Sequence, residues 1–123
     1  MEKLVKEGSD LTPAIDFDPS SGNFVISGKS VPEDSMGFYA PVIDWLKEYV
    51  EQPANKTTFS FKLEYFNTSS SKILLDIFNI LENVKDTLCF NWYCEEDDED
   101  LEESASDFGE VLSYDINIVK FKW

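Results

Sequence analysis

The residues of this 123-residue chain that are best suited to chemistry are four consecutive hydroxyl side chains, Thr68, Ser69, Ser70 and Ser71. They lie between an alternating apolar run and a helix-like run, in the stretch FNTSSSKILLDIF. One hydroxyl is enough to cap a helix, so a cluster of four suggests a second role. The helix dipole would favour a phosphate there by about 0.3–1 kcal/mol. The cluster is therefore a candidate phosphorylation site. The alternative is that Asn67 or Thr68 caps the helix and the serines solvate its first turn.

Catalytic groups of the ordinary kinds are not supplied by the sequence. The chain contains no histidine to activate a serine or cysteine, and it has no glycine-rich loop to hold a phosphate. Cys89 and Cys94 lie five residues apart in an apparent strand, so they should point to opposite faces about 16 Å apart. A disulfide needs Cα atoms within about 7 Å. We therefore expect two reduced thiols, no enzymatic activity and no cofactor.

The most acidic stretch of the chain runs from Glu95 to Glu103, where eight of nine residues carry carboxylates. Calcium loops need ligands at fixed alternating positions and a glycine at the turn, and this run offers neither. Carboxylates favour the positive end of a helix dipole. We therefore expect no metal site, and we interpret the run as a solvated loop or the start of a helix.

Charge and length indicate the class of protein and of partner. The chain has 25 acidic and 10 basic residues, and the net charge of −15 opposes binding to nucleic acids or anionic membranes. Proteins with basic patches are the expected partners. The start MEKLVKEGSD has no apolar core, and no apolar run approaches the roughly 18 residues of a membrane helix. We expect one cytoplasmic domain over residues 1–123, in which the sequons at Asn55 and Asn67 carry no glycan.

Alternation of apolar and polar residues predicts five strands. They are Ala14–Asp18 and Asn23–Ser27, joined as a hairpin by a PSSG turn, then Thr57–Phe66, Leu88–Tyr93 and a closing strand from Tyr114 to Trp123. In the third strand, the predicted buried face carries Phe59, Phe61, Leu63 and Tyr65. Tyr93 and Phe66 are expected near solvent, where exposed aromatic residues are candidate contacts for a partner.

Helical spacing predicts three helices. For the first, Ser30 is the expected cap and Pro32 the first helical residue, with a kink at Pro41 or a separate turn before a helix from Pro41 to Glu51. The second follows the hydroxyl cluster and buries the stripe Ile73, Ile77, Ile80, Leu81 and Val84. The third is a short helix from Leu101 to Leu112.

The resulting order, β-β-α-β-α-β-α-β, predicts an α/β fold with a single mixed β-sheet. Each helical crossover should join parallel strands in a right-handed manner, so only the N-terminal hairpin should be antiparallel. A strand covered on both faces is apolar throughout, whereas the strands here alternate. We therefore expect helices mainly on one face of the sheet.

Several segments of the chain resemble one protein family. The stretch YFNTSSSK after an alternating strand resembles the phosphoacceptor motif of the SiaC family of bacterial regulatory phosphoproteins. TPAIDFD, GNFVISGKSVPED and FYAPVIDWL are similar to the N-terminal half of that family, so the resemblance runs from about Thr12 to the C-terminus. Such proteins resemble STAS-type anti-sigma-factor antagonists, which carry a phosphorylated hydroxyl at the same kind of strand-to-helix junction. The resemblance implies a STAS-like fold.

The resemblance also implies a signalling circuit. A Ser/Thr protein kinase would phosphorylate Thr68, a PP2C-like phosphatase would remove the phosphate, and the unmodified form would bind and activate an effector, in this family a diguanylate cyclase of c-di-GMP signalling. The expected surround of the phosphosite and contact for partners is Asn67, Ser69, Ser70, Ser71 and Lys72. The alternative of a different class is a constitutive acidic protein-binding module that is not phosphorylated.

Overall fold

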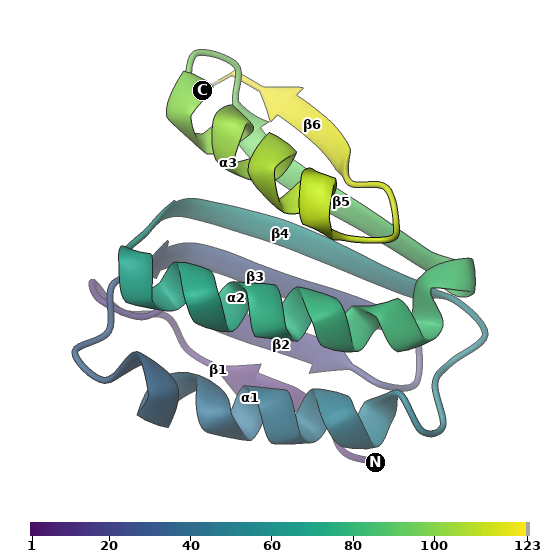
Figure 1. Ribbon diagram of the computed structural model, residues 1–123. Helices are drawn as coiled ribbons and strands as arrows, with labels where there is room; N and C mark the ends of the chain where they lie inside the picture. The colour runs from purple at the N-terminus through teal and green to yellow at the C-terminus, as the bar shows by residue number, and fades with distance from the viewer. Residues whose placement is uncertain (123) are drawn as a thin grey trace.

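The computed structural model describes residues 1–122 and, within them, shows a six-stranded sheet with its helices on one side (Figure 1). In chain order the elements are β1 (Leu4–Lys6), β2 (Ala14–Asp18), β3 (Asn23–Ser30), α1 (Ser35–Tyr49), β4 (Thr57–Phe66), α2 (Thr68–Ile80), the 3-10 helix η1 (Leu81–Thr87), β5 (Leu88–Glu95), α3 (Glu99–Val111) and β6 (Asn117–Phe121).

The strands lie in the sheet in the same order as in the chain, β1-β2-β3-β4-β5-β6. The pairs β3–β4, β4–β5 and β5–β6 are parallel, and α1, α2 and α3 make the three crossovers. Right-handed crossovers that all advance in one direction place their helices on the same face, as Figure 1 shows. The predicted fold class, a single mixed sheet with one helix-covered face, is confirmed.

One antiparallel pair was not predicted. Strand β1 pairs with β2 in antiparallel register, Leu4 opposite Phe17, so the hairpin of β2 and β3 is not the only antiparallel pair in the described sheet. A strand of three residues is too short to show alternation in the sequence. Packing holds it in place, since Leu4 lies against the core and the indole Nε1 of Trp45 donates a hydrogen bond to the carbonyl of Glu2 at 3.0 Å.

The first helix differs from its prediction in both its cap and its length. It begins at Ser35 and is capped by Asp34, whose Oδ1 accepts a hydrogen bond from the Gly37 N–H at 3.0 Å. Ser30 does not cap it, because Ser30 is the last residue of β3 and is fully buried. The helix also continues through Pro41. Pro41 has no backbone N–H, so the carbonyl of Gly37 lacks its hydrogen bond within the helix. Both residues are exposed, so water can solvate that carbonyl instead.

Strand β4 has the predicted bounds but contains a β-bulge. Gly28 of β3 pairs with Leu63 and Lys29 pairs with Tyr65, so Glu64 has no opposite residue. The extra residue shifts the alternation by one, so the side chains of β4 after Glu64 lie on the opposite faces of the sheet from those predicted. Tyr65 is therefore 57% exposed, and Phe66 turns toward the core, where its ring centroid lies 6.2 Å from that of Trp92. The prediction of a buried Tyr65 was wrong, and Phe66, which was expected near solvent, is half-buried and packs against the core.

An aromatic core fills the space between the sheet and the helices. Ring centroids are 5.1 Å apart for Phe59 and Phe90 and 4.3 Å apart for Phe61 and Trp92, and these four side chains are at most 1% exposed. From α2, Phe78 packs edge-on against Phe90 at 5.0 Å. Burying such large apolar side chains contributes about 1.5–3 kcal/mol each. The core thereby fixes α2 firmly over the sheet.

The C-terminal half follows the predictions with small differences. The predicted stripe of the second helix extends into η1, where Leu81 and Val84 are buried. The third predicted helix corresponds to α3, and the closing strand corresponds to β6, which is shorter than predicted. Trp123, the predicted end of that strand, lies outside the described residues. None of the helices within residues 1–122 is both long enough and apolar enough to cross a membrane.

Candidate functional site

The hydroxyl cluster forms the first turn of α2, directly after β4. The cap is Asn67, whose Oδ1 accepts a hydrogen bond from the Ser70 N–H at 2.9 Å, and Thr68 is the first helical residue. Parallel strands β3, β4 and β5 end at the same edge of the sheet, where α1, α2 and α3 begin (Figure 1). Open α/β sheets bind their ligands at this edge.

Ser70 is buried and belongs to what we call the buried hydroxyl chain, formed by Tyr39, Ser30 and Ser70. The Oγ of Ser30 lies 2.6 Å from the Tyr39 hydroxyl and 2.8 Å from the Ser70 Oγ. The Ser70 hydroxyl also donates to the Ser30 carbonyl at 3.1 Å. Burial raises the pKa of Tyr39 to about 12, against the smaller effect of the Ser30 hydrogen bond. The buried hydroxyl chain joins α1, β3 and α2 by hydrogen bonds. Because Ser70 is buried in it, another protein cannot reach the Ser70 hydroxyl.

Ser69 links the starts of the two neighbouring helices. Its hydroxyl donates to the Asn67 Oδ1 at 3.1 Å, and its Oγ lies 2.7 Å from the Oγ of Ser35, the first residue of α1. Ser35, Ser30 and Tyr39 could not be recognised as members of the site from the sequence, because they lie far from it along the chain. Ser35 is 34 residues from Ser69, and Ser30 is 40 residues from Ser70.

Thr68 is the hydroxyl that faces solvent without a partner. It is exposed, and within residues 1–122 its side chain makes no hydrogen bond. Ser71 is half-buried, and Lys72 is exposed one turn after Thr68. The structure therefore brings Asn67, Ser69 and Ser70 into one hydrogen-bonded group and leaves Thr68 and Lys72 exposed outside it.

The electrostatic setting of Thr68 suits an added anion. The first turn of α2 contains no acidic residue, in contrast to α3, whose first turn has three. The positive end of the α2 dipole is thus not offset by side chains of its own first turn. Lys72 follows Thr68 by four residues, a spacing at which opposite charges attract on a helix surface. A phosphate on Thr68 would therefore be tolerated by the fold.

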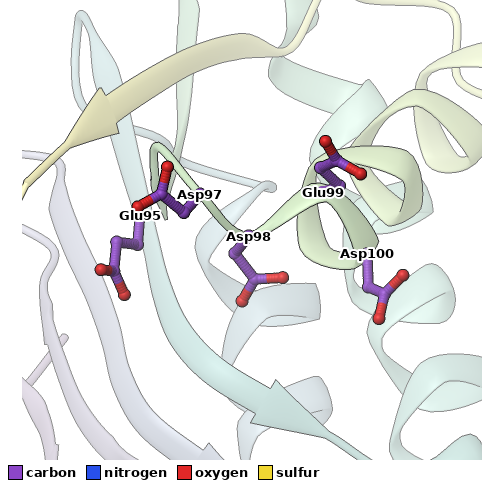
Figure 2. A pocket seen from close by; sticks show the side chains of 5 residues that line it. All are labelled: Glu95, Asp97, Asp98, Glu99 and Asp100. Atoms are coloured by element: carbon purple, nitrogen blue, oxygen red, sulfur yellow. The ribbon is translucent and has the colours of Figure 1, made fainter.

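The acidic run forms the end of β5, a turn and the first turn of α3, which confirms the predicted helix start. Asp98 caps α3, its Oδ1 accepting a hydrogen bond from the Leu101 N–H at 3.0 Å. Figure 2 shows Asp97 and Glu99 pointing to one side of this segment and Glu95, Asp98 and Asp100 to the other. Within residues 1–122 there is no group of three Cys, Asp or Glu side chains arranged to hold a metal ion.

The two cysteines are unpaired and lie on opposite faces of β5, as predicted. Cys94 faces the helices and is buried, and burial raises the pKa of its thiol, with a smaller contribution from the nearby Glu102. Cys89 is half-buried, and its Sγ lies 3.6 Å from the Asn91 Oδ1. A thiol with a raised pKa is a poor nucleophile, so Cys94 is structural.

Comparison with known proteins gives consistent matches over nearly the whole chain. A family model described as SiaC family regulatory phosphoprotein matches residues 6–121. An uncharacterized protein of Pseudomonas aeruginosa is 31% identical over 117 residues, which covers 93% of each chain.

Solved structures match equally well. The structure of SiaC of Pseudomonas aeruginosa superposes with a TM-score of 0.88 at 29% identity, covering 98% of this chain and 100% of that one. A second match, with a TM-score of 0.88 and 30% identity, is to the crystal structure of the diguanylate cyclase SiaD in complex with its activator SiaC from the same organism. It covers 96% of this chain and 99% of the matched chain.

Proposed function

Because this chain belongs to the SiaC family of regulatory phosphoproteins, we propose that it is a switch whose phosphorylation state controls binding to and activation of a diguanylate cyclase. The observation that carries the proposal is the match, over 96% of the chain, to a structure in which SiaC is the activator bound to such a cyclase. The chain then acts as the regulatory partner of an enzyme. Its two free thiols fit a reducing compartment, which in this proposal is the cytoplasm.

Thr68 is the phosphoacceptor in this proposal. It is the exposed hydroxyl of the cluster whose side chain is not engaged, whereas Ser70 is enclosed and Ser69 is held between Asn67 and Ser35. A Ser/Thr protein kinase adds the phosphate and a PP2C-like phosphatase removes it. These enzymes and the cyclase contact the exposed surround of Thr68, which includes Ser69 and Lys72. Asn67, Ser70 and Ser71 support that surface through the helix cap and its packing.

The phosphate acts on the partner rather than on the fold. It adds up to about two negative charges, which the start of α2 tolerates. When a partner covers Thr68, however, those charges must lose their water, and burial of an uncompensated charge costs several kcal/mol. Each 1.4 kcal/mol is about tenfold in affinity. The unmodified form therefore binds the cyclase, and the phosphorylated form is released.

The test measures binding to the cyclase of the same host and formation of c-di-GMP. Thr68→Ala should bind and activate as the unmodified protein does, yet resist the kinase. Thr68→Glu should weaken binding by about tenfold or more, as should the phosphorylated protein. Ser106→Glu is the matched control, because Ser106 is an exposed hydroxyl on α3 outside the cluster, and it should bind normally.

A constitutive acidic binding module predicts a different result. All three variants would then bind alike, and the affinity would follow the acidic surface and fall steeply with added salt. Equal binding by Thr68→Ala, Thr68→Glu and Ser106→Glu, together with failure of the kinase to label Thr68, would overturn the switch.

A further inference from the structure

Strands β4 and β5 separate before they end. Their ladder pairs Thr57–Phe61 with Leu88–Trp92 and stops there. Beyond it β4 continues to Phe66, while β5 continues to Glu95 and pairs with β6 on its other side. The sheet is therefore split at the edge where the helices begin, and the start of α3 follows immediately after β5.

A groove occupies this split. Its inner part, of about 110 Å³, lies between residues 62–64 of β4 and 93–95 of β5, and it adjoins an outer hollow of about 270 Å³ beside Tyr65 and Phe66. Both parts share Glu64, Asp98 and Leu101, and together we call them the β4–β5 groove. The bulge at Glu64 contributes to this shape, since it turns Tyr65 outward to form part of the wall.

The groove combines an apolar floor with carboxylates. Leu63, Cys94 and Leu101 line it and are at most 8% exposed. Its carboxylates belong to Glu64, Glu95, Asp98 and Asp100. Three of these, Glu95, Asp98 and Asp100, point to the same side of the β5–α3 segment in Figure 2.

The carboxylates of the groove form no ion pair with a basic side chain within residues 1–122. The ion pairs within residues 1–122 are Lys3–Asp18, Lys120–Glu102 and Lys122–Glu96, so none of them involves a groove carboxylate. Lys62 also lines the inner part, and its Nζ lies over the Tyr93 ring of the same part, 4.7 Å from the centroid, so one lysine stands beside four carboxylates. The groove is thus a negatively charged opening with an apolar interior.

We propose that the β4–β5 groove binds an arginine side chain presented by a protein partner. An arginine has an apolar stem and a cationic head, so the stem would lie along Leu101 and the half-buried Tyr93 ring. The guanidinium would lie among Glu64, Glu95 and the Asp98 oxygen that does not cap α3. Five N–H donors suit several carboxylates at once. The volume of the inner part fits one side chain rather than a nucleotide or a folded domain. The proposal is independent of Thr68 and goes beyond the proposed function.

The test is an NMR titration of the full, ¹⁵N-labelled chain with the peptide acetyl-Gly-Leu-Arg-Leu-Gly-amide at low salt. The backbone amides of residues 62–64 and 93–95 should shift. The same peptide with citrulline, which keeps the shape but not the charge, should bind at least about tenfold more weakly. A lysine peptide should fall in between, because an ammonium cannot bind two carboxylates in a planar fork.

Matched variants separate the groove from general attraction to an acidic protein. Glu64→Gln with Glu95→Gln should weaken binding by about tenfold. Glu48→Gln in the last turn of α1 with Glu51→Gln just after that helix should leave it within about twofold. If Glu95→Gln disturbs β5, the exposed pair Glu64→Gln with Asp100→Asn gives the same comparison. Equal loss in the groove and control pairs, or equal binding of the citrulline peptide, would overturn the proposal.

Discussion

Ser30→Ala tests whether the buried hydroxyl chain beneath Thr68 is held together by its hydrogen bonds. One order of protons satisfies every contact: the Tyr39 hydroxyl donates to Ser30, Ser30 donates to Ser70, and Ser70 donates to the Ser30 carbonyl. Removing the Ser30 hydroxyl leaves the Tyr39 O–H without an acceptor in the core. Ser70 keeps its bond to the carbonyl, which is a backbone group and remains.

The expected cost follows from the number of bonds and orphaned groups. Ser30→Ala removes two side-chain hydrogen bonds, at about 1 kcal/mol each, and strands a buried donor at about 1–3 kcal/mol, so the free energy of unfolding should fall by about 3–5 kcal/mol. Tyr39→Phe removes one bond without orphaning a donor and should cost about 1 kcal/mol. The double variant loses the same two bonds and strands no donor, and the sum of the single costs counts the Tyr39–Ser30 bond twice. Its cost should therefore be below that sum by about 2–4 kcal/mol.

The assay is urea unfolding of the four proteins, followed by tryptophan fluorescence, which the fully buried Trp92 makes sensitive to unfolding. Ser106→Ala, at an exposed hydroxyl of α3, is the control and should change the free energy of unfolding by less than about 0.5 kcal/mol. Strict additivity of Ser30→Ala and Tyr39→Phe, or a larger cost for Tyr39→Phe than for Ser30→Ala, would refute the assigned order of donors.

Three further outcomes are expected. The pKa of Tyr39 is raised from 10.0 to about 12 and that of Tyr114 is also raised, so above pH 10 the unfolded chain releases protons that the folded chain keeps. The free energy of unfolding should therefore fall as pH rises from about 10 to 12, and Tyr39→Phe should flatten that decline in urea melts at each pH. Asp98→Ala should lower the free energy of unfolding by about 1 kcal/mol through loss of the α3 cap, while Asp98→Ser should retain most of it; equal losses would argue against capping. Deletion of Glu64 should cost several kcal/mol in the same melts, because it removes the bulge and turns the two following aromatic residues to the wrong faces, whereas Glu64→Ala should be nearly neutral.

Much of the fold could be predicted because only one face of the sheet is covered by helices, so apolar and polar residues alternate along its longer strands. The alternation in β4 correctly assigned Phe59, Phe61 and Leu63 to the core. It failed from Glu64 onward, because a bulge depends on the pairing with β3 and leaves no mark in the composition of β4. Likewise β1 was missed because tertiary contacts, not its own three residues, hold it in the sheet.

The candidate site was predicted less completely than the strand and helix that carry it. The hydroxyl pattern located the start of α2, with Asn67 as one of two possible caps and Thr68 in the first turn. It could not distinguish among the four hydroxyls, because the contacts that bury Ser70 and engage Ser69 come from Ser30 and Ser35, far away in the chain. Ser30 was assigned as a helix cap for the same reason: serine suits a cap locally, and only the folded chain shows it paired with Tyr39.

The strand order has a consequence for how the chain folds. Within the described sheet each strand pairs with the strand that precedes it, so the sheet can grow at one edge as the ribosome delivers its strands in turn. Each strand can pair as soon as it leaves the ribosome, because its partner in the sheet has already been synthesised. Each crossover between parallel strands closes a loop only as long as one helix and its turns. The hairpin of β2 and β3 is the natural template on which β4, then β5, then β6 are added, so synthesis and folding can proceed in the same direction.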